Sequence, residues 1–452
     1  MTANEVQTPT YLPYGGYAES EVEWIERLPV HWSTRRLKTV LAEPITDGPH
    51  ESPEFVMEGV PFLSVDGIQD GELRFEGCRF VSLEEHLRFR RKCAPRRDDI
   101  LFGKAASTGK IARVKTDQEF SVWSPLALIR GNNNSIESAF LEYALKAPET
   151  QFQIDLLCNS NTQKNIGMSD IPLLAIPLPP LPEQRAIAAF LDRQTVKIDE
   201  LIAKKERLIA LLQEQRAAVI THAVTRGIEP AAPMKDSGVE WLGEVPAHWV
   251  MKKLGYIADL VSGGTPSKER PDYWRGDVPW VSPKDMKRER INDAEDHISA
   301  VAVAETGLRL LPVETVLIVV RGMILGHSFP VAVTTARVTI NQDMKGLLTR
   351  GRIDPSYFAL LLIGLKNVVL SYIEEAAHGT RKLRTEVWKA IPVAVPPRAE
   401  QLKLVSRLER DTQTTTALID SVKAASDRLR EYRSALISAA VTGKIDVRGE
   451  AE

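Results

Sequence analysis

Two short stretches contain residue types that could do chemistry. Gly103 to Ile111 (GKAASTGKI) resembles a phosphate-binding loop, but five residues separate its glycines rather than four. Ile111 stands where such loops carry the Ser or Thr that holds Mg²⁺. Asp343-Met344-Lys345 has the spacing of half a metal-nuclease motif, with Glu314 as a candidate upstream acid. The corresponding strand of the first half, Val122 to Ile129, contains no acid, so a metal-dependent nuclease is the weaker alternative and we expect no catalytic residues.

Metal and redox sites are not indicated either. The eight histidines are scattered, and His31 and His248, which precede repeated tryptophans, fit packing or capping roles. The three cysteines are widely spaced and form no CxxC pair, which fits a reduced cytoplasm. No apolar run approaches the roughly 20 residues of a membrane span. We therefore expect no metal, no membrane contact and a cytoplasmic protein.

Overall composition is that of a globular protein. The chain has 452 residues, of which 43% are hydrophobic and 26% are charged, and its net charge is −2. At about 100–200 residues per domain, this length indicates two to four domains. The near-neutral total excludes a uniformly basic coat for nucleic acid.

A local imbalance of charge points to DNA. Between Arg88 and Lys115 ten basic residues face only Asp98 and Asp99, which leaves +8. Such a cluster is expected where a protein contacts phosphates, although a solvated basic face would look the same. The candidate DNA contacts in this stretch are Arg88, Arg90, Arg91, Lys92, Arg96, Arg97, Lys104 and Lys110.

Several loops also suit close approach to DNA. Ser262 to Lys268 (SGGTPSK) is small and rich in hydroxyls, and Asn159 to Asn165 is rich in amides, which pair with adenine edges. His378 to Lys382 occupies the position in the second half that corresponds to Asn159 to Asn165 in the first, and its arginine could hydrogen-bond to a guanine edge. Ordinary turns contain such residues too. The candidates are Asn161, Thr162, Gln163, Lys164, Thr265, Ser267, Lys268, Thr380, Arg381 and Lys382, with Arg321 and the basic pairs Arg35-Arg36 and Lys252-Lys253.

The elements that must position these residues occur twice. Val22 to Leu41 and Val239 to Ala258 are offset by 217 residues and agree at 7 of 20 positions. At the same offset, Leu212 to Ile228 and Leu429 to Ile445 agree at 9 of 17. The segments between these blocks share little sequence. We therefore expect the repeated parts to make the same contact twice and the divergent parts to recognise two different targets.

Each half ends in a long predicted helix. Glu183 to Ala223 contains no Gly or Pro, and Leu191, Ile198, Leu212 and Val219 recur at steps of seven or fourteen residues. Leu201 lies three residues beyond Ile198, and Leu208 lies three beyond Lys205, which interrupts the seam. The second copy has Leu408, Val422, Leu429 and Leu436, with Leu418 between them. Two such helices in one chain favour intramolecular pairing, although a bundle helix or an intermolecular coiled coil would give the same pattern.

The divergent parts are predicted as small mixed α/β domains. Expected strands are Val60 to Ile68, Asp99 to Phe102, Val122 to Arg130, Val278 to Val281, Thr315 to Val320 and Thr339 to Leu348.

The motifs together are similar to a known family. Thr46-Asp47-Gly48-Pro49-His50 and Ser262 to Ser267 begin the two variable parts, and Ile176 to Gln184 and Ile391 to Gln401 end them. Over roughly Val22 to Val447 the chain resembles the specificity subunit of type I restriction-modification systems. One departure is Arg398-Ala399, where the first copy has Leu181-Pro182.

This resemblance implies an α+β fold with two mixed α/β target recognition domains. Two long helices packed as an antiparallel coiled coil would join them with pseudo-two-fold symmetry. The boundaries expected are an N-terminal segment 1–21, target recognition domain 1 at 22–178, a spacer helix at 179–226, a linker at 227–238, target recognition domain 2 at 239–395, a second spacer helix at 396–447 and a tail at 448–452.

The resemblance also implies a function. Each domain would read one half of a bipartite site in double-stranded DNA, and the repeats would hold two modification (methyltransferase) subunits and two restriction subunits. The chain itself would need no cofactor, because S-adenosylmethionine belongs to the modification partner, and ATP and Mg²⁺ belong to the restriction partner. A coiled-coil protein–protein adaptor without DNA readout is the other alternative.

Overall fold

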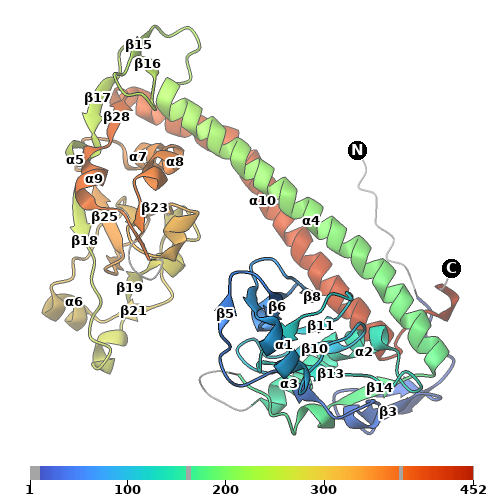
Figure 1. Cartoon of the computed structure of the whole chain (residues 1–452). Coiled ribbons are helices and arrows are strands. Elements are labelled where there is room, and N and C mark those ends of the chain that lie inside the picture. The colour runs from blue at the N-terminus through green and yellow to red at the C-terminus, as the bar shows by residue number, and fades with distance from the viewer. Residues whose placement is uncertain (1–10, 159–163, 376–379, 451–452) are drawn as a thin grey trace. The chain divides into compact units, whose positions relative to one another are not determined.

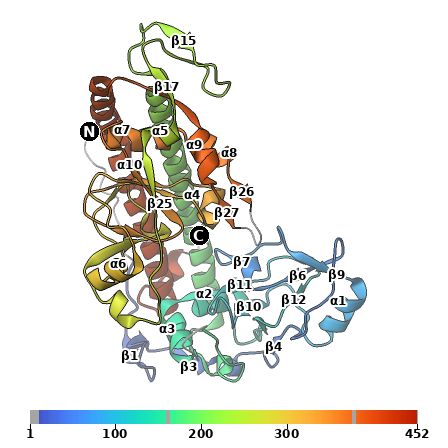
Figure 2. The same cartoon turned by 90° about the vertical axis from the view of Figure 1, so that its left-hand side faces the viewer.

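A computed structural model describes residues 11–158, 164–375 and 380–450. The chain divides into two compact units, Met1–Lys205 with Ala424–Glu452 (unit 1) and Glu206–Lys423 (unit 2). Each unit consists of an α/β part and one segment of each of two long helices, and the two helix segments lie side by side (Figures 1 and 2). No helix among the described residues is both long and apolar enough to cross a membrane.

The two long helices are α4 (Leu181–Arg226) and α10 (Arg398–Val441). Unit 1 holds the beginning of α4 and the end of α10, and unit 2 holds the end of α4 and the beginning of α10. The helices are therefore antiparallel. Both are longer than the interval between Glu183 and Ala223. Proline is tolerated in a first helical turn, so α4 begins before Pro182, and Gly227 at φ +75° ends it.

The buried stripe of α4 alternates steps of three and four residues. Leu191 and Ile198 are buried as expected, and Thr195 lies between them. Leu201 and Leu208 are 47% and 41% exposed, so the expectation that they lie in the seam is wrong. A step of four from Ile198 reaches Ile202, which packs against the unit 1 core, whereas a step of three leaves the stripe.

In α10 the same alternation brings Thr412, Ile419, Val422 and Ser426 into the buried stripe. Leu418, expected in the seam, is 44% exposed, because its neighbour Ile419 occupies the inward position. Polar Thr and Ser thus interrupt an otherwise apolar stripe.

The α/β part of unit 1 contains two four-stranded sheets, ordered β11-β10-β13-β4 and β12-β6-β9-β5. Neighbours are antiparallel except for the parallel pair β6–β12. The elements are β1 (Tyr17–Glu19), β2 (Arg27–Pro29), β3 (Ser33–Arg36), β4 (Thr46–Asp47), β5 (Phe55–Val56), β6 (Val60–Leu63), β7 (Ile68–Gln69), β8 (Glu72–Leu73), β9 (Arg79–Val81), α1 (Leu83–Arg90), β10 (Ile100–Gly103), β11 (Ile111–Arg113), β12 (Ser121–Val122), β13 (Leu126–Ile129), α2 (Ser138–Lys146), α3 (Pro148–Leu157) and β14 (Ala175–Leu178).

Unit 2 repeats this plan with different residues. Its larger sheet is ordered β18-β25-β22-β23-β20 and its smaller one β21-β19-β24, with β19 and β24 parallel. The elements are β15 (Met234–Asp236), β16 (Glu244–Pro246), β17 (Val250–Lys253), α5 (Leu254–Ile257), β18 (Asp259–Ser262), β19 (Val278–Val281), β20 (Arg290–Ile291), β21 (His297–Ile298), α6 (Ala300–Thr306), β22 (Val316–Val319), β23 (Val331–Thr334), β24 (Thr339–Ile340), β25 (Met344–Leu348), α7 (Pro355–Gly364), α8 (Lys366–Ser371), β26 (Glu374–Glu375), β27 (Arg381–Lys382), α9 (Thr385–Ala390) and β28 (Pro392–Val395).

Three expected strands are each divided in two. The segment Thr339 to Leu348 forms β24 and β25, because the Asn341 side chain accepts a hydrogen bond from the Asp343 N–H (3.1 Å) and turns the chain. The turn Trp123 to Leu126, in which the Leu126 N–H donates to the Trp123 carbonyl (2.9 Å), divides β12 from β13. In Val60 to Ile68, a short 3₁₀ turn at Val65–Gly67 follows β6. The turns let each segment contribute to both sheets of its unit or to a hairpin.

Candidate nucleic-acid interface

Each repeated His-Trp pair contacts a glutamate at the beginning of one long helix. Trp32 Nε1 donates to the Glu183 carboxylate (2.9 Å), and His31 Nε2 lies 2.8 Å from the other oxygen. Trp249 and His248 contact Glu400 in the same way, at 3.1 and 2.7 Å. The two histidines thus form a structural hydrogen bond rather than the packing or capping contact expected, and each His-Trp-Glu group attaches a helix to its α/β part.

The adjacent glutamines form a second repeated contact. The Gln184 side chain accepts from the Glu137 N–H and donates to the Pro179 carbonyl, both at 2.8 Å. Gln401 does the same with the Asp354 N–H and the Pro396 carbonyl. The repeated Glu-Gln dipeptides are thus structural, a role that sequence reasoning had not assigned.

The repeated basic pairs occupy equivalent strands. Arg35 and Arg36 are exposed on β3, which pairs with β14, and Lys252 and Lys253 are exposed on β17, which pairs with β28. None of these four side chains has an acidic partner within 4 Å in the described part of the chain. They stay predicted contacts to DNA or to a partner protein.

A glycine in each unit permits a loop to lie directly on the strand that joins the two sheets. A Cβ on Gly48 would lie 1.9 Å from the Val122 carbonyl oxygen, and one on Gly263 would lie 2.2 Å from that of Ile340. Only glycine fits at such distances. The loops after β4 and β18, which carried the resemblance, are therefore fixed against their sheets at equivalent points.

The basic cluster of unit 1 is largely neutralised by acids from elsewhere in the chain. Three of its candidates, Arg91, Arg96 and Lys110, have no carboxylate within 4 Å of their side-chain cations among the residues described, although the Arg96 backbone N–H donates to Asp99 (2.7 Å). The others form ion pairs, which are Arg88–Glu51, Arg88–Glu85, Arg90–Glu119, Lys92–Asp47, Arg97–Asp117, Lys104–Asp47, Arg113–Asp98, Arg113–Glu142 and Lys115–Glu72. The local +8 therefore overstates the free charge of this surface.

Asp47 lies at the centre of this neutralisation. It is 5% exposed, and its carboxylate contacts Lys92, Lys104 (2.7 Å) and His50 (3.0 Å). Burial by itself would raise the pKa of Asp47, but hydrogen bonds from Lys104 and Lys92 and their positive charges lower it below its ordinary value.

Unit 2 has the opposite arrangement at the equivalent place. In the β18–β25 ladder Ser262 lies opposite Lys345, whereas in the β4–β13 ladder Asp47 lies opposite Ala127. Lys345 Nζ donates to Ser262 Oγ (2.6 Å). Burial, followed by the charges of Lys382 and Arg321, lowers the pKa of Lys345. We call Arg321, Lys345 and Lys382 the cation cluster of unit 2.

The variable loops return to equivalent strand ends. Asn165 forms a bridge with Ala105 beyond β10, and Lys382 forms one with Arg321 beyond β22. Candidates Asn161, Thr162 and Gln163 lie outside the described residues. Lys164 pairs with Asp155 (2.7 Å). Each loop thus ends beside the central strand of its larger sheet.

The remaining candidates of unit 2 lie near these points. Thr265 donates to Gln342, and Ser267 Oγ accepts from the Glu269 N–H (3.3 Å). Lys268 is exposed and Thr380 is partly exposed. Arg381 lies 3.9 Å from Glu375.

Comparisons with known proteins bear on this arrangement. The family described as "Type I restriction modification DNA specificity domain" matches residues 29–210 and 246–425. The chain belongs to this family. Each match covers one α/β part together with the helix segment that follows it in the sequence, so the chain has two specificity domains.

Two curated relatives are specificity subunits. The chain is 28% identical over 284 residues to the EcoR124I/EcoR124II specificity subunit of Escherichia coli, which is 61% of this chain and 64% of that protein. It is 30% identical over 173 residues to the MjaIX specificity subunit of Methanocaldococcus jannaschii, 37% of this chain and 38% of that protein. The chain thus spans less than two thirds of the length of either relative.

A solved structure has the same fold. A chain from the work titled "Structural basis underlying complex assembly and conformational transition of the type I R-M system" has a TM-score of 0.62 at 17% identity, over 92% of this chain and 99% of that one. The expected fold class is therefore confirmed, with mixed α/β domains and long paired helices.

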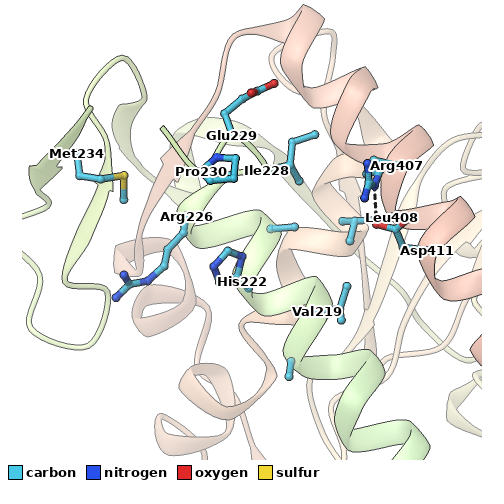
Figure 3. Close-up of a pocket in the computed structure, with 13 residues that line it drawn as sticks. Val219, His222, Arg226, Ile228, Glu229, Pro230, Met234, Arg407, Leu408 and Asp411 are labelled. Atoms are coloured by element: carbon cyan, nitrogen blue, oxygen red, sulfur yellow. Dashed lines mark hydrogen bonds and ion pairs between the residues drawn. The ribbon is translucent and has the colours of Figure 1, made fainter. Parts of the chain in front are cut away.

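The specificity domains differ at the ends of their long helices. In unit 2 a groove of about 750 Å³ lies between the end of α4 and the beginning of α10, lined by Val219, His222, Arg407 and Asp411 among others (Figure 3). Phe190 precedes Arg407 by the repeat offset of 217 residues. In unit 1 the Tyr11 ring packs on Phe190, with ring centres 5.2 Å apart. Tyr11 thus packs on α4 in unit 1 at the position whose repeat counterpart, Arg407, lines the groove in unit 2.

In the sequence, Lys345 stands out only as part of a possible nuclease motif. The signal that could have indicated another role was a lysine inside an otherwise apolar strand, MKGLL. No cluster of three or more His, Cys, Asp or Glu side chains suited to a metal occurs in the described ranges.

Proposed function

We propose that the chain is the DNA sequence-recognition subunit of a type I restriction-modification complex, in which each unit reads one half of a bipartite, asymmetric site. One observation carries this proposal. The same scaffold, with its His-Trp-Glu and Glu-Gln contacts, occurs twice and presents two unlike sets of loops. A duplicated scaffold with unlike readers suits two different half-sites.

The long helices act as a spacer in this proposal. At 1.5 Å per residue, the 46 residues of α4 span about 69 Å, which exceeds the ~34 Å between half-sites one DNA turn apart. Because both units include segments of both helices, helix length sets the gap between the half-sites.

The repeated contacts supply two equivalent docking places for two modification subunits, and two restriction subunits join that assembly. Methyl transfer to a flipped adenine uses S-adenosylmethionine bound by the modification subunits, and ATP and Mg²⁺ serve the restriction subunits. This chain recognises the DNA sequence, binds no cofactor and catalyses no reaction. The complex works in the cytoplasm, which suits three free cysteines.

The test is methylome sequencing of a host that expresses the full chain with its modification partner. We expect methylated adenines within two unlike short sequences separated by a fixed gap. A palindromic site, or methylation unchanged by the chain, would contradict the proposal. An adaptor without DNA readout would in addition show no salt-dependent binding to random duplex.

A further inference from the structure

Three cations lie together in unit 2 without a neutralising acid. Arg321 follows β22, Lys345 is on β25 and Lys382 is on β27, and the bridge between Arg321 and Lys382 closes the group. No carboxylate in the described part of the chain lies within 4 Å of any of the three side-chain cations.

The nearby acids Glu374 and Asp343 do not pair with these three side chains. Glu374 lies opposite Lys382 in the β26–β27 ladder, but its carboxylate pairs with Arg384 (2.5 Å). Asp343 accepts from the Arg321 N–H (3.3 Å) through its backbone carbonyl, not its carboxylate. The positive charge of the cation cluster of unit 2 is therefore not neutralised by these acids.

Lys345 has unused donors. Its ammonium has three N–H groups, and Ser262 takes only one of them. Lys345 is partly buried, whereas Arg321 and Lys382 are exposed. A partly desolvated ammonium beside two like charges is unfavourable in the free protein, and an anion that contacts all three would remove that cost.

We propose that Arg321, Lys345 and Lys382 together bind one phosphate group of the DNA backbone, and that this anchor exists in unit 2 only. In unit 1 Asp47 already neutralises the corresponding position through Lys92 and Lys104. This inference rests on the proposed function and adds a difference between the two readers. Unit 2 holds its half-site with a phosphate clamp at the strand ends, and unit 1 positions its half-site by other contacts.

The test compares full-length variants on a random-sequence duplex over a range of salt concentrations. Lys345→Met and Lys382→Gln each remove one charge from the cluster, and Lys287→Gln removes one from an exposed lysine (76% exposed) elsewhere in unit 2. One phosphate contact contributes roughly 0.9 to the slope of log affinity against log salt. We expect the slope to flatten by up to that amount in either cluster variant and to stay unchanged in Lys287→Gln.

Stability separates a binding role from a structural one. Because Lys345 lies among like charges, Lys345→Met should melt at the same temperature as the native chain or higher, while it binds DNA more weakly. Inorganic phosphate should raise the melting temperature of the native chain more than that of Lys345→Met.

Two outcomes overturn the inference, namely an unchanged salt slope in both cluster variants, or a lower melting temperature for Lys345→Met with equal response to phosphate. If instead the native chain shows no salt-dependent binding to DNA at all, the proposed function itself fails. The two failures are therefore distinguishable.

Discussion

Trp32 donates its indole N–H to Glu183 at 2.9 Å across 151 residues of sequence, and Trp249 does the same to Glu400 across 151 residues. The two contacts link the beginning of a long helix to the strand that precedes each variable part. Their recurrence explains why His, Trp and Glu persist in both copies while the residues between them diverge.

The two carboxylates should differ in what their removal costs. Glu183 also accepts from Tyr14 (3.3 Å) and lies 3.7 Å from Arg448, whereas Glu400 contacts only His248 and Trp249 among the described side chains. We expect Glu183→Gln to lower the free energy of unfolding by about 1–3 kcal/mol, and Glu400→Gln by less. Calorimetric melting measures both, with the exposed Glu214→Gln as a control. Equal losses would contradict the asymmetry.

Among the clustered cations of unit 1, only those without an acidic partner should contribute to the salt dependence of DNA binding. The side-chain cations of Arg91 and Arg96 have no acidic partner within the described residues, but those of Arg90 and Arg97 pair with Glu119 and Asp117. Neutralising Arg91 and Arg96 together should flatten the log–log slope by up to roughly 0.9 for each phosphate that the variant no longer binds. Neutralising all four should flatten it little further.

Titration of binding against salt measures these slopes, with Lys197→Gln as the control. A much larger effect of the quadruple variant would mean that DNA displaces the acidic partners. If neither variant changed the slope, this surface would be a solvated basic face that does not contact DNA phosphates.

Helix length should determine the gap in the recognised DNA sequence. Deleting one heptad from α4 and one from α10 preserves the phase of both buried stripes, because seven residues are two turns of the seam. We expect a shorter gap between unchanged half-sites, read by methylome sequencing. Deleting four residues from α4 alone is the matched control, since it rotates the stripe and should destabilise the pairing. A heptad variant that methylates sites with the original gap would refute the spacer role.

Asp47 should make the stability of unit 1 depend on pH in the acid range. Its folded-state pKa is lowered, so the stability that it contributes is present above the unfolded value of about 3.9 and is lost as the pH falls through the folded value. We expect Asp47→Asn to melt well below the native chain at pH 7. That difference should begin to narrow below about pH 4, where Asp47 of the unfolded chain binds a proton, and should be smallest once the pH lies below the lowered folded-state pKa. A difference independent of pH would show that charge is not the cause.

The repeat, the two halves and the long helices followed from the sequence, because identity at a fixed offset and an uninterrupted heptad pattern are local, one-dimensional signals. The same periodicity misplaced Leu201 and Leu208. A step of three and a step of four both stay near a stripe, and only packing shows that Ile202 and not Leu201 faces inward.

Charge was the property that sequence alone could not resolve. The sequence showed ten bases against two acids between Arg88 and Lys115, but folding brings Asp47, Glu119 and Glu142 to that stretch from other parts of the chain. Conversely, Lys345, Arg321 and Lys382 are separated by 24 and 37 residues and become one group only through the strand ends. Residue types and repeats are written along the chain, whereas the free charge of a surface depends on which side chains the tertiary structure brings within a few ångströms.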